Sequence, residues 1–254
     1  QKNSTYIALT QPWAEGLIAR PIDTAIASGL MRDEQAKFNV NNLIDTNGKR
    51  RDVDAGVLVH LLTILKLDPG IANAIVDWLD ADDDVSSPGG AENDYYWSQR
   101  PAWRAPNRAI FSIDELRRVK GVNDKVFATL SPFITALPRP LPSSGERTKI
   151  NINTSSVEIL QAVLSTAAPD EISEIIRLRE LPFTDATDIK TRRPRLSPTV
   201  VDTFLDVNSR YFEAALAITG ESAQMRQSAL LQLQSPSQGS AASIWPAIIW
   251  VKEQ

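Results

Sequence analysis

One stretch of this chain carries more negative charge than a folded segment tolerates unaided. Between Asp77 and Asp94 there are seven carboxylates and no Lys or Arg, a local charge of −7 in a chain whose net charge is −4. The seven are Asp77, Asp80, Asp82, Asp83, Asp84, Glu92 and Asp94. Carboxylates at this density repel one another, so the segment is expected to be poorly ordered unless a cation lies among them.

The residue types in the chain favour Ca²⁺ as that cation. With no Cys and a single His, the available ligands are oxygens, which suit a hard cation. Asp80, Asp82 and Asp84 stand at positions 1, 3 and 5 of an EF-hand-like run. However, Val85 occupies the position that requires Gly, and Ala91 the position that requires Glu. The segment is therefore not an EF-hand.

We predict a longer loop that, like an EF-hand, surrounds the ion with carboxylate oxygens. Aspartates at the end of a helix supply some oxygens, Gly89 and Gly90 allow a tight return, and acids after the return close the cage. The aromatic run 95–97 is expected to anchor the loop to a core. The predicted ligands, for one or two Ca²⁺ ions, are Asp80, Asp82, Asp83, Asp84, Glu92 and Asp94. The alternatives are Mg²⁺, which demands tighter octahedral geometry, and a solvated acidic surface loop.

Composition excludes several classes of protein. A chain of 254 residues with 43% hydrophobic residues can form one large domain or two small ones. The sequence pI of about 5.2 argues against general affinity for nucleic acid or anionic membranes. The absence of Cys excludes a disulfide framework, a Cys-based zinc site and a thiol nucleophile. The chain opens with Gln-Lys-Asn and has no run of 18 apolar residues, so we expect a processed or trimmed protein without a membrane span.

The middle of the chain is predicted to be helical. Apolar residues recur at helical spacing from Asp52 to Leu67, and Pro69 begins a second helix that ends at Leu79, where the acidic stretch leaves. Further helical segments are predicted at 113–119, 123–130, 155–164, 169–180, 184–189 and 197–205. A Pro-rich linker is predicted at 138–145.

The two ends of the chain are predicted to form strands. Strand-like segments occur at 22–26, 29–40, 209–218, 223–233 and 244–251, and the last three read as an antiparallel meander. The expected fold class is α+β. Residues 1–51 and 206–254 form a discontinuous sheet domain, and residues 52–205, with the acidic loop 77–97, form an inserted helical domain.

Helix pairs at 116–133 and 155–178 look like helix-hairpin-helix units, which makes DNA binding the alternative function. Such units grip phosphate through the backbone N–H groups of a Gly-rich hairpin. Here the first hairpin has one Gly and an acid, and the second has no Gly and a Pro. The basic surface that DNA binding requires is also weak, so we interpret both pairs as packing motifs.

No enzyme is predicted. A Ser-His-Asp site would need His60, the only His, and that residue lies on an apolar helix without a nucleophile elbow. No P-loop or Rossmann fingerprint is present. Paired acids for glycoside hydrolysis remain an option, but such acids usually lie in an apolar cleft, whereas here they cluster in one polar loop.

Several sequence words together resemble the K-type minor pseudopilins of bacterial type II secretion systems. They are Asp33–Asn42 (DEQAKFNVNN), Asp77–Asp82 (DWLDAD), Gly90–Tyr96 (GAENDYY), Ile150–Thr154 (ININT) and Ser209–Phe212 (SRYF). Their order and spacing make the set specific. The chain departs from the family where Asn93 stands in place of an acid and Ala36 in place of Gly, and the first change affects one potential metal ligand.

The resemblance implies a pilin-like α+β fold in which a large all-helical domain, with helix-hairpin-helix-like units, is inserted into an antiparallel sheet domain. In the acidic loop, the chain is similar to calcium-binding members of the family. When the ligands of those members are carried over residue by residue, the resemblance favours Asp80, Asp82, Glu92 and Asp94, with Asp83 and Asp84 next.

The resemblance also implies a structural rather than a catalytic role. Family members are expected to cap and initiate the secretion pseudopilus together with the minor pseudopilins I and J, with H nearby. Direct contact with secreted proteins stays open. The resemblance further implies an N-terminal apolar helix that anchors the full-length protein in the bacterial inner membrane. We expect that helix to be absent here and the chain to correspond to the periplasmic part.

Overall fold

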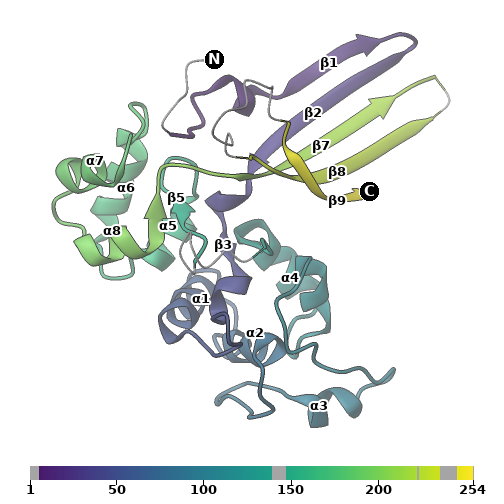
Figure 1. Ribbon diagram of the computed structural model, residues 1–254, viewed down its shortest axis with the longest axis vertical. Helices are drawn as coiled ribbons and strands as arrows, with labels where there is room; N and C mark the ends of the chain where they lie inside the picture. The colour runs from purple at the N-terminus through teal and green to yellow at the C-terminus, as the bar shows by residue number, and fades with distance from the viewer. Residues whose placement is uncertain (1–5, 139–146, 222, 235–244, 254) are drawn as a thin grey trace.

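The sheet predicted from the two ends of the chain is present. The computed structural model describes residues 6–138, 147–221, 223–234 and 245–253. Its main sheet has five antiparallel strands in the order β1-β2-β7-β8-β9 (Figure 1). They are β1 Leu17–Ile22, β2 Ala25–Asp33, β7 Tyr211–Thr219, β8 Gln224–Gln232 and β9 Ala247–Glu253. The predicted α+β fold class is confirmed.

Two strand predictions near the N-terminus need correction. The segment 22–26 is a hairpin turn rather than a strand, because Asp23 adopts a positive φ of 52° between β1 and β2. Within the segment 29–40, β2 ends at Asp33, whose side chain accepts a hydrogen bond from the N–H of Gln35 and starts the 3₁₀ helix η2, Glu34–Ala36. Only Phe38–Asn39 then forms a second, short strand, β3. Apart from Pro138, the predicted linker 138–145 lies outside the described residues.

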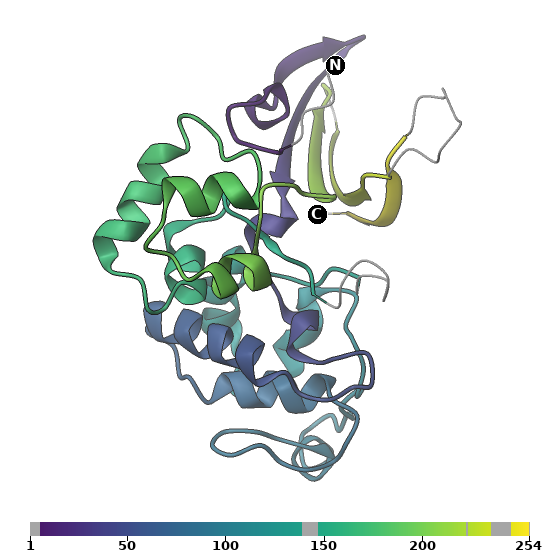
Figure 2. The same ribbon diagram turned by 60° about the vertical axis from the view of Figure 1, so that its left-hand side comes forward.

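The helices lie between β2 and β7 in sequence, and both views place them beyond one end of the strands (Figures 1 and 2). They are α1 Asp52–Ile64, α2 Ile71–Leu79, α3 Asn93–Trp97, α4 Asp124–Leu130, α5 Val157–Val163, α6 Pro169–Leu178, α7 Ala186–Arg192 and α8 Pro198–Phe204. Asn123, Ser156 and Asp185 cap their helices by accepting a backbone N–H through the side chain. Within the described ranges, no helix is long and apolar enough to cross a bilayer.

The predicted insert 52–205 is not wholly helical. Its segment 113–119 is largely a 3₁₀ helix, η4 Ile113–Arg118. It also contributes to two short parallel strand pairs, β3 Phe38–Asn39 with β4 Ile134–Thr135, and β5 Ile150–Asn151 with β6 Leu205–Asp206. Strands of two residues are too short to produce an alternating pattern, so no periodicity predicted their pairing.

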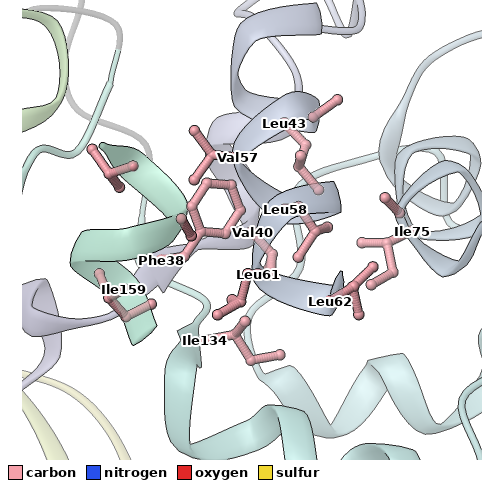
Figure 3. Packing of buried hydrophobic residues seen from close by; sticks show 14 of the residues in the cluster. Phe38, Val40, Leu43, Val57, Leu58, Leu61, Leu62, Ile75, Ile134 and Ile159 are labelled. Atoms are coloured by element: carbon pink, nitrogen blue, oxygen red, sulfur yellow. The ribbon is translucent and has the colours of Figure 1, made fainter. Parts of the chain in front are cut away.

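The core of the helical part surrounds α1 (Figure 3). Leu58, Leu61 and Leu62 are fully buried and contribute the apolar face that the helical spacing predicted. Phe38 and Val40 pack in the same cluster, together with Ile75 of α2 and Ile159 of α5. Residues 38–44 therefore pack with the helices, although the predicted domain boundary follows residue 51; that boundary stays a prediction.

Buried asparagine side chains join distant segments of the helical part. Each pairs with both main-chain groups of one residue: Asn41 accepts from the N–H of Ile110 at 2.9 Å and donates to its carbonyl at 2.9 Å. Asn42 does the same with Thr148, at 3.0 and 2.9 Å. The further pairs are Asn39 with Leu137 and Asn153 with Phe183. Each side-chain amide thus makes the two main-chain hydrogen bonds that a neighbouring strand would otherwise make.

A buried carboxylate joins the sheet to the helical part. Asp33, the last residue of β2, accepts hydrogen bonds from Ser209 Oγ at 2.6 Å, Thr154 Oγ1 at 2.6 Å and Asn151 Nδ2 at 3.2 Å, besides the N–H of Gln35 at 2.8 Å. Burial raises the pKa of Asp33, and these donors oppose the rise. Three of the sequence words that carry the family resemblance, Asp33–Asn42, Ile150–Thr154 and Ser209–Phe212, therefore converge on one side chain.

Asp33→Ala is expected to lower the free energy of unfolding by at least about 3 kcal/mol, because it leaves several buried donors unpaired. Denaturant unfolding measures the change. Asp202→Ala is the matched control, since that carboxylate is half exposed and pairs with Lys190 on the surface; we expect at most about 1 kcal/mol there. Equal losses for the two variants would contradict the role of Asp33.

Candidate functional site

The acidic loop begins at a rigid element. Every residue of α2 is buried, including Asp77 in its last turn. Asp80 follows the last helical residue and is held by a hydrogen bond from its N–H to the carbonyl of Val76 at 2.9 Å. Negative side chains at this helix end are unfavourable, because the helix dipole is also negative there. The first two acids of the loop are thus fixed in position against an electrostatic cost.

The loop returns through two glycines that no other residue could replace. A Cβ at Gly90 would lie 2.2 Å from Oδ2 of Asp77 and 2.3 Å from the carbonyl oxygen of Ser86. Gly89 has a φ of +92°, and a Cβ there would lie 2.7 Å from the carbonyl oxygen of Gly70. The tight return predicted from the Gly-Gly pair is confirmed.

The returning segment is anchored by Tyr96. Its ring is fully buried and packs edge-on against Trp78 of α2, with ring centroids 5.0 Å apart. Lys120 supports the loop by donating from Nζ to the carbonyl of Gly90 at 3.0 Å. Trp97, by contrast, is 55% exposed, so the anchor is Tyr96 with part of Tyr95 rather than the whole aromatic run.

Two of the predicted ligands, Asp80 and Glu92, are buried and only 4% exposed. Within the described part of the chain, Oδ1 of Asp80 and both carboxylate oxygens of Glu92 have no hydrogen-bond partner. Burial and the nearby Asp82 and Asp77 raise the pKa of Asp80 to about 7. The pKa of Glu92 is raised to about 8, mainly by burial and then by the negative charges of Asp77, Asp80, Asp83 and Asp82. These acids therefore form one electrostatic cluster.

The remaining predicted ligands lie at the surface. Asp82 accepts from the N–H of the exposed Asp84 at 3.0 Å, and Asp83 accepts from Nδ2 of Asn93 at 2.8 Å. Asp94 is exposed in the first turn of α3. It lines a cavity of about 440 Å³ together with Asp83, Glu92, Arg104 and Lys120, among other residues.

The donor set fits a hard cation, but its side chains do not converge on one point. Buried carboxylate oxygens without partners are what a divalent ion would satisfy. Among the described residues, however, no three His, Cys, Asp or Glu side chains are grouped closely enough to hold a metal ion. The metal assignment therefore stays a prediction.

Sequence reasoning missed two members of this region. The predicted ligands do not include Asp77, although its position one turn before Asp80 places both acids on one helix face. In the sequence, Asn93 stands out only as a missing acid. Its amide in fact holds Asp83 and accepts the N–H of Ala105 at 3.1 Å, which fixes the return of the loop.

Comparison with known proteins gives consistent matches. A family model described as "Type II secretion system (T2SS), protein K" matches residues 36–139. Type II secretion system protein K of Aeromonas hydrophila is 28% identical over 229 residues, which are 83% of this chain and 67% of that protein. The Pseudomonas aeruginosa protein is 29% identical over 188 residues, 72% of this chain and 54% of that protein. The chain thus spans between about half and two thirds of these relatives.

A solved structure shares the fold. One chain of a crystal structure described as the GspK-GspI-GspJ complex from the enterotoxigenic Escherichia coli Type 2 Secretion System aligns with a TM-score of 0.80 and 24% identity. The alignment covers 99% of this chain and 88% of that one. These matches give the DNA-binding alternative no support.

The buried acids predict an unusual pH dependence for the cation-free protein. Because the folded pKa values of Asp80 and Glu92 lie above those of an unfolded chain, the folded state binds more protons between about pH 4 and pH 8. Stability contributed by these groups is present at low pH and is lost as the pH rises through about 7 to 8. In EDTA, the denaturant concentration at the midpoint of unfolding should therefore decrease as the pH is raised from 5.5 to 8.5.

The variant Glu92→Gln should reduce that dependence, because it removes one of the two titrating groups while keeping its shape. Asp84→Asn is the control, since it removes an exposed carboxylate of the same loop and should leave the slope as it was. A slope that is the same in all three proteins would show that the buried acids do not govern the pH dependence.

Proposed function

The chain belongs to the type II secretion system protein K family, and from this premise we propose that it is the structural tip subunit of the secretion pseudopilus. In this role it caps the fibre, initiates its assembly and serves protein export across the outer membrane. It builds rather than catalyses. We also propose that it acts in the periplasm and that the full-length protein is anchored in the inner membrane.

The position of the helical part supports this proposal most directly. The chain leaves the sheet at the end of β2 and returns to it at the start of β7, and α1–α8 fill the space beyond that end (Figure 2). The hydrogen bonds to Asp33 hold the two parts together at the crossing point. A further subunit stacked on this end would meet the helices instead of the sheet. Such a subunit can terminate a fibre but cannot lie within one.

The proposed partners are the minor pseudopilins I and J, with H nearby. Support comes from the solved structure of similar fold, whose description names a complex of GspK with GspI and GspJ.

We further propose that the acidic loop binds Ca²⁺. Asp80 and Glu92 supply the buried carboxylates, and Asp82, Asp83, Asp84 and Asp94 are the other candidate ligands. The ion would compensate the charge of buried carboxylates whose oxygens have no hydrogen-bond partner among the described residues. Its role is structural, since it would tie the end of α2 to the returning segment before α3.

Calcium should raise the melting temperature of the EDTA-treated protein. A site of about 10⁻⁴–10⁻³ M affinity would contribute about 1 kcal/mol at millimolar Ca²⁺, which corresponds to about 2–4 °C in a chain of this size. The double variant Asp82→Asn, Glu92→Gln should lose this shift. Its control is Asp202→Asn, Glu221→Gln, which changes the charge equally outside the loop. A double variant that still responds to Ca²⁺ as the wild type does would remove the site assignment.

The tip role predicts where the protein is found on a fibre. Because the chain has no Cys, Leu181→Cys, at a site 72% exposed in the helical part, can carry a single gold label. We expect electron micrographs of assembled pseudopili to show the label at one end only. Labels spaced along the fibres would rule out a capping role. The mass of the complex formed with soluble I and J subunits checks independently that assembly itself takes place.

A further inference from the structure

The two edges of the main sheet differ in their capacity to accept another strand. The β1 edge is irregular: Pro21 lacks an N–H, Ala19 has a positive φ of 44°, and the register with β2 shifts between Leu17 and Arg20. Prolines and bulges of this kind protect a sheet edge against further pairing. β9 also shows one register shift, opposite Leu230 and Leu231 of β8, but it contains neither Pro, Gly nor a residue of positive φ. Among the described residues, β9 pairs with β8 alone.

An antiparallel strand at the edge of a sheet leaves alternate N–H and C=O groups pointing away from its neighbour. In β9 this open edge coincides with exposed apolar side chains: Ile248 is 64% exposed and Val251 is 55% exposed. The partner that fits this edge is another extended segment, because only an extended backbone offers a row of donors and acceptors that matches the free main-chain groups. A helix or a small molecule does not offer such a row.

An apolar cavity of about 750 Å³ lies between β9 and the helical part. Ile249 and Trp250 of β9 form one wall, and the segment 107–111 forms part of the opposite wall. Arg108 is the single charged residue among those described in its lining. The views of Figures 1 and 2 show β9 on the side of the sheet nearer to α4. The cavity is within the size range of specific binding pockets.

The wall of the cavity is held in place from both sides. Lys252 of β9 donates from Nζ to Oδ2 of Asp114 at 2.7 Å and to Oγ of Ser112 at 2.7 Å, so the strand is tied to η4. On the other side, the amide of Asn41 fixes both main-chain groups of Ile110. The hollow is thus part of the folded molecule rather than a gap between loose segments.

We propose that β9 and this cavity form a docking surface for an extended segment of a partner pseudopilin. The segment adds a strand to the free edge of β9 and inserts a large apolar side chain into the cavity. Main-chain hydrogen bonds then supply affinity and the cavity supplies specificity, as in other cases of strand addition. The inference rests on the proposed assembly function, and it identifies the surface that the assembly uses.

The test mixes the protein with soluble I and J subunits and measures the dissociation constant by titration and the exchange of the amides 247–253 by mass spectrometry. In the complex, these amides should exchange at least about tenfold more slowly. Ile249→Glu should weaken binding at least about tenfold, because it places a charge in an apolar cavity. Ala109→Trp, which fills the cavity from the opposite wall, should weaken binding similarly without altering β9.

The matched control is Ile18→Glu, which places the same charge at an exposed site of the β1 edge and should bind as the wild type does. Melting curves check that each variant is folded. A complex that forms without slower exchange in β9, or one that tolerates both cavity variants, would overturn the docking surface while leaving the assembly function intact. Failure to form any complex would overturn both. A homodimer of the chain alone that protects β9 would show that a second copy, not a pseudopilin partner, occupies this edge.

Discussion

The buried carboxylate of Asp33 is the interaction on which the architecture depends. It stands where the chain leaves the sheet, and it gathers donors from the segment before α5 and from the approach to β7. Together with the hydrogen bonds of Gln35 with Lys149 and Arg210, and of Glu34 with Thr135, it fixes the helical part relative to the strands at this crossing. The proposed tip role needs that fixed relation, because only a rigidly placed helical block prevents another subunit from stacking above the sheet.

In the acidic loop, a buried carboxylate has, within the described part of the chain, no hydrogen-bond donors of the kind that surround Asp33. Asp33 and Glu92 are both buried carboxylates whose pKa values are raised by burial, but four donors surround Asp33, whereas both oxygens of Glu92 have no partner among the described residues. Burying a charge is costly unless it is compensated. At Asp33 the compensation comes from the chain itself, while at Glu92 it has to come from a proton or a cation. This contrast is the physical basis for proposing Ca²⁺ at one site and a structural role at the other.

Much of the fold could be predicted from local pattern. The helical spacing of α1 identified Leu58, Leu61 and Leu62 as core residues, and turn residues separated the strands β7 and β8. The pairing of the two-residue strands and that of Asn41 with Ile110 could not be predicted, because contacts between such distant residues, 69 apart for Asn41 and Ile110, leave no periodic trace. In the candidate site, the pattern found the acids and the Gly-Gly return. It could not separate the buried Asp80 and Glu92 from the exposed Asp84 and Asp94, since burial depends on where α2 and Tyr96 pack.

The sequence by itself determined which elements form, which segment concentrates negative charge, and which family the chain resembles, because composition, period and short words are properties of neighbouring residues. Only the tertiary structure decided that three of those words meet at Asp33. It also decided that two of the acids lose their contact with water and that β9 keeps an open edge beside an apolar cavity. Each of these features depends on segments far apart in the chain, and their free energies are set by the partners and the solvent that folding brings together or removes.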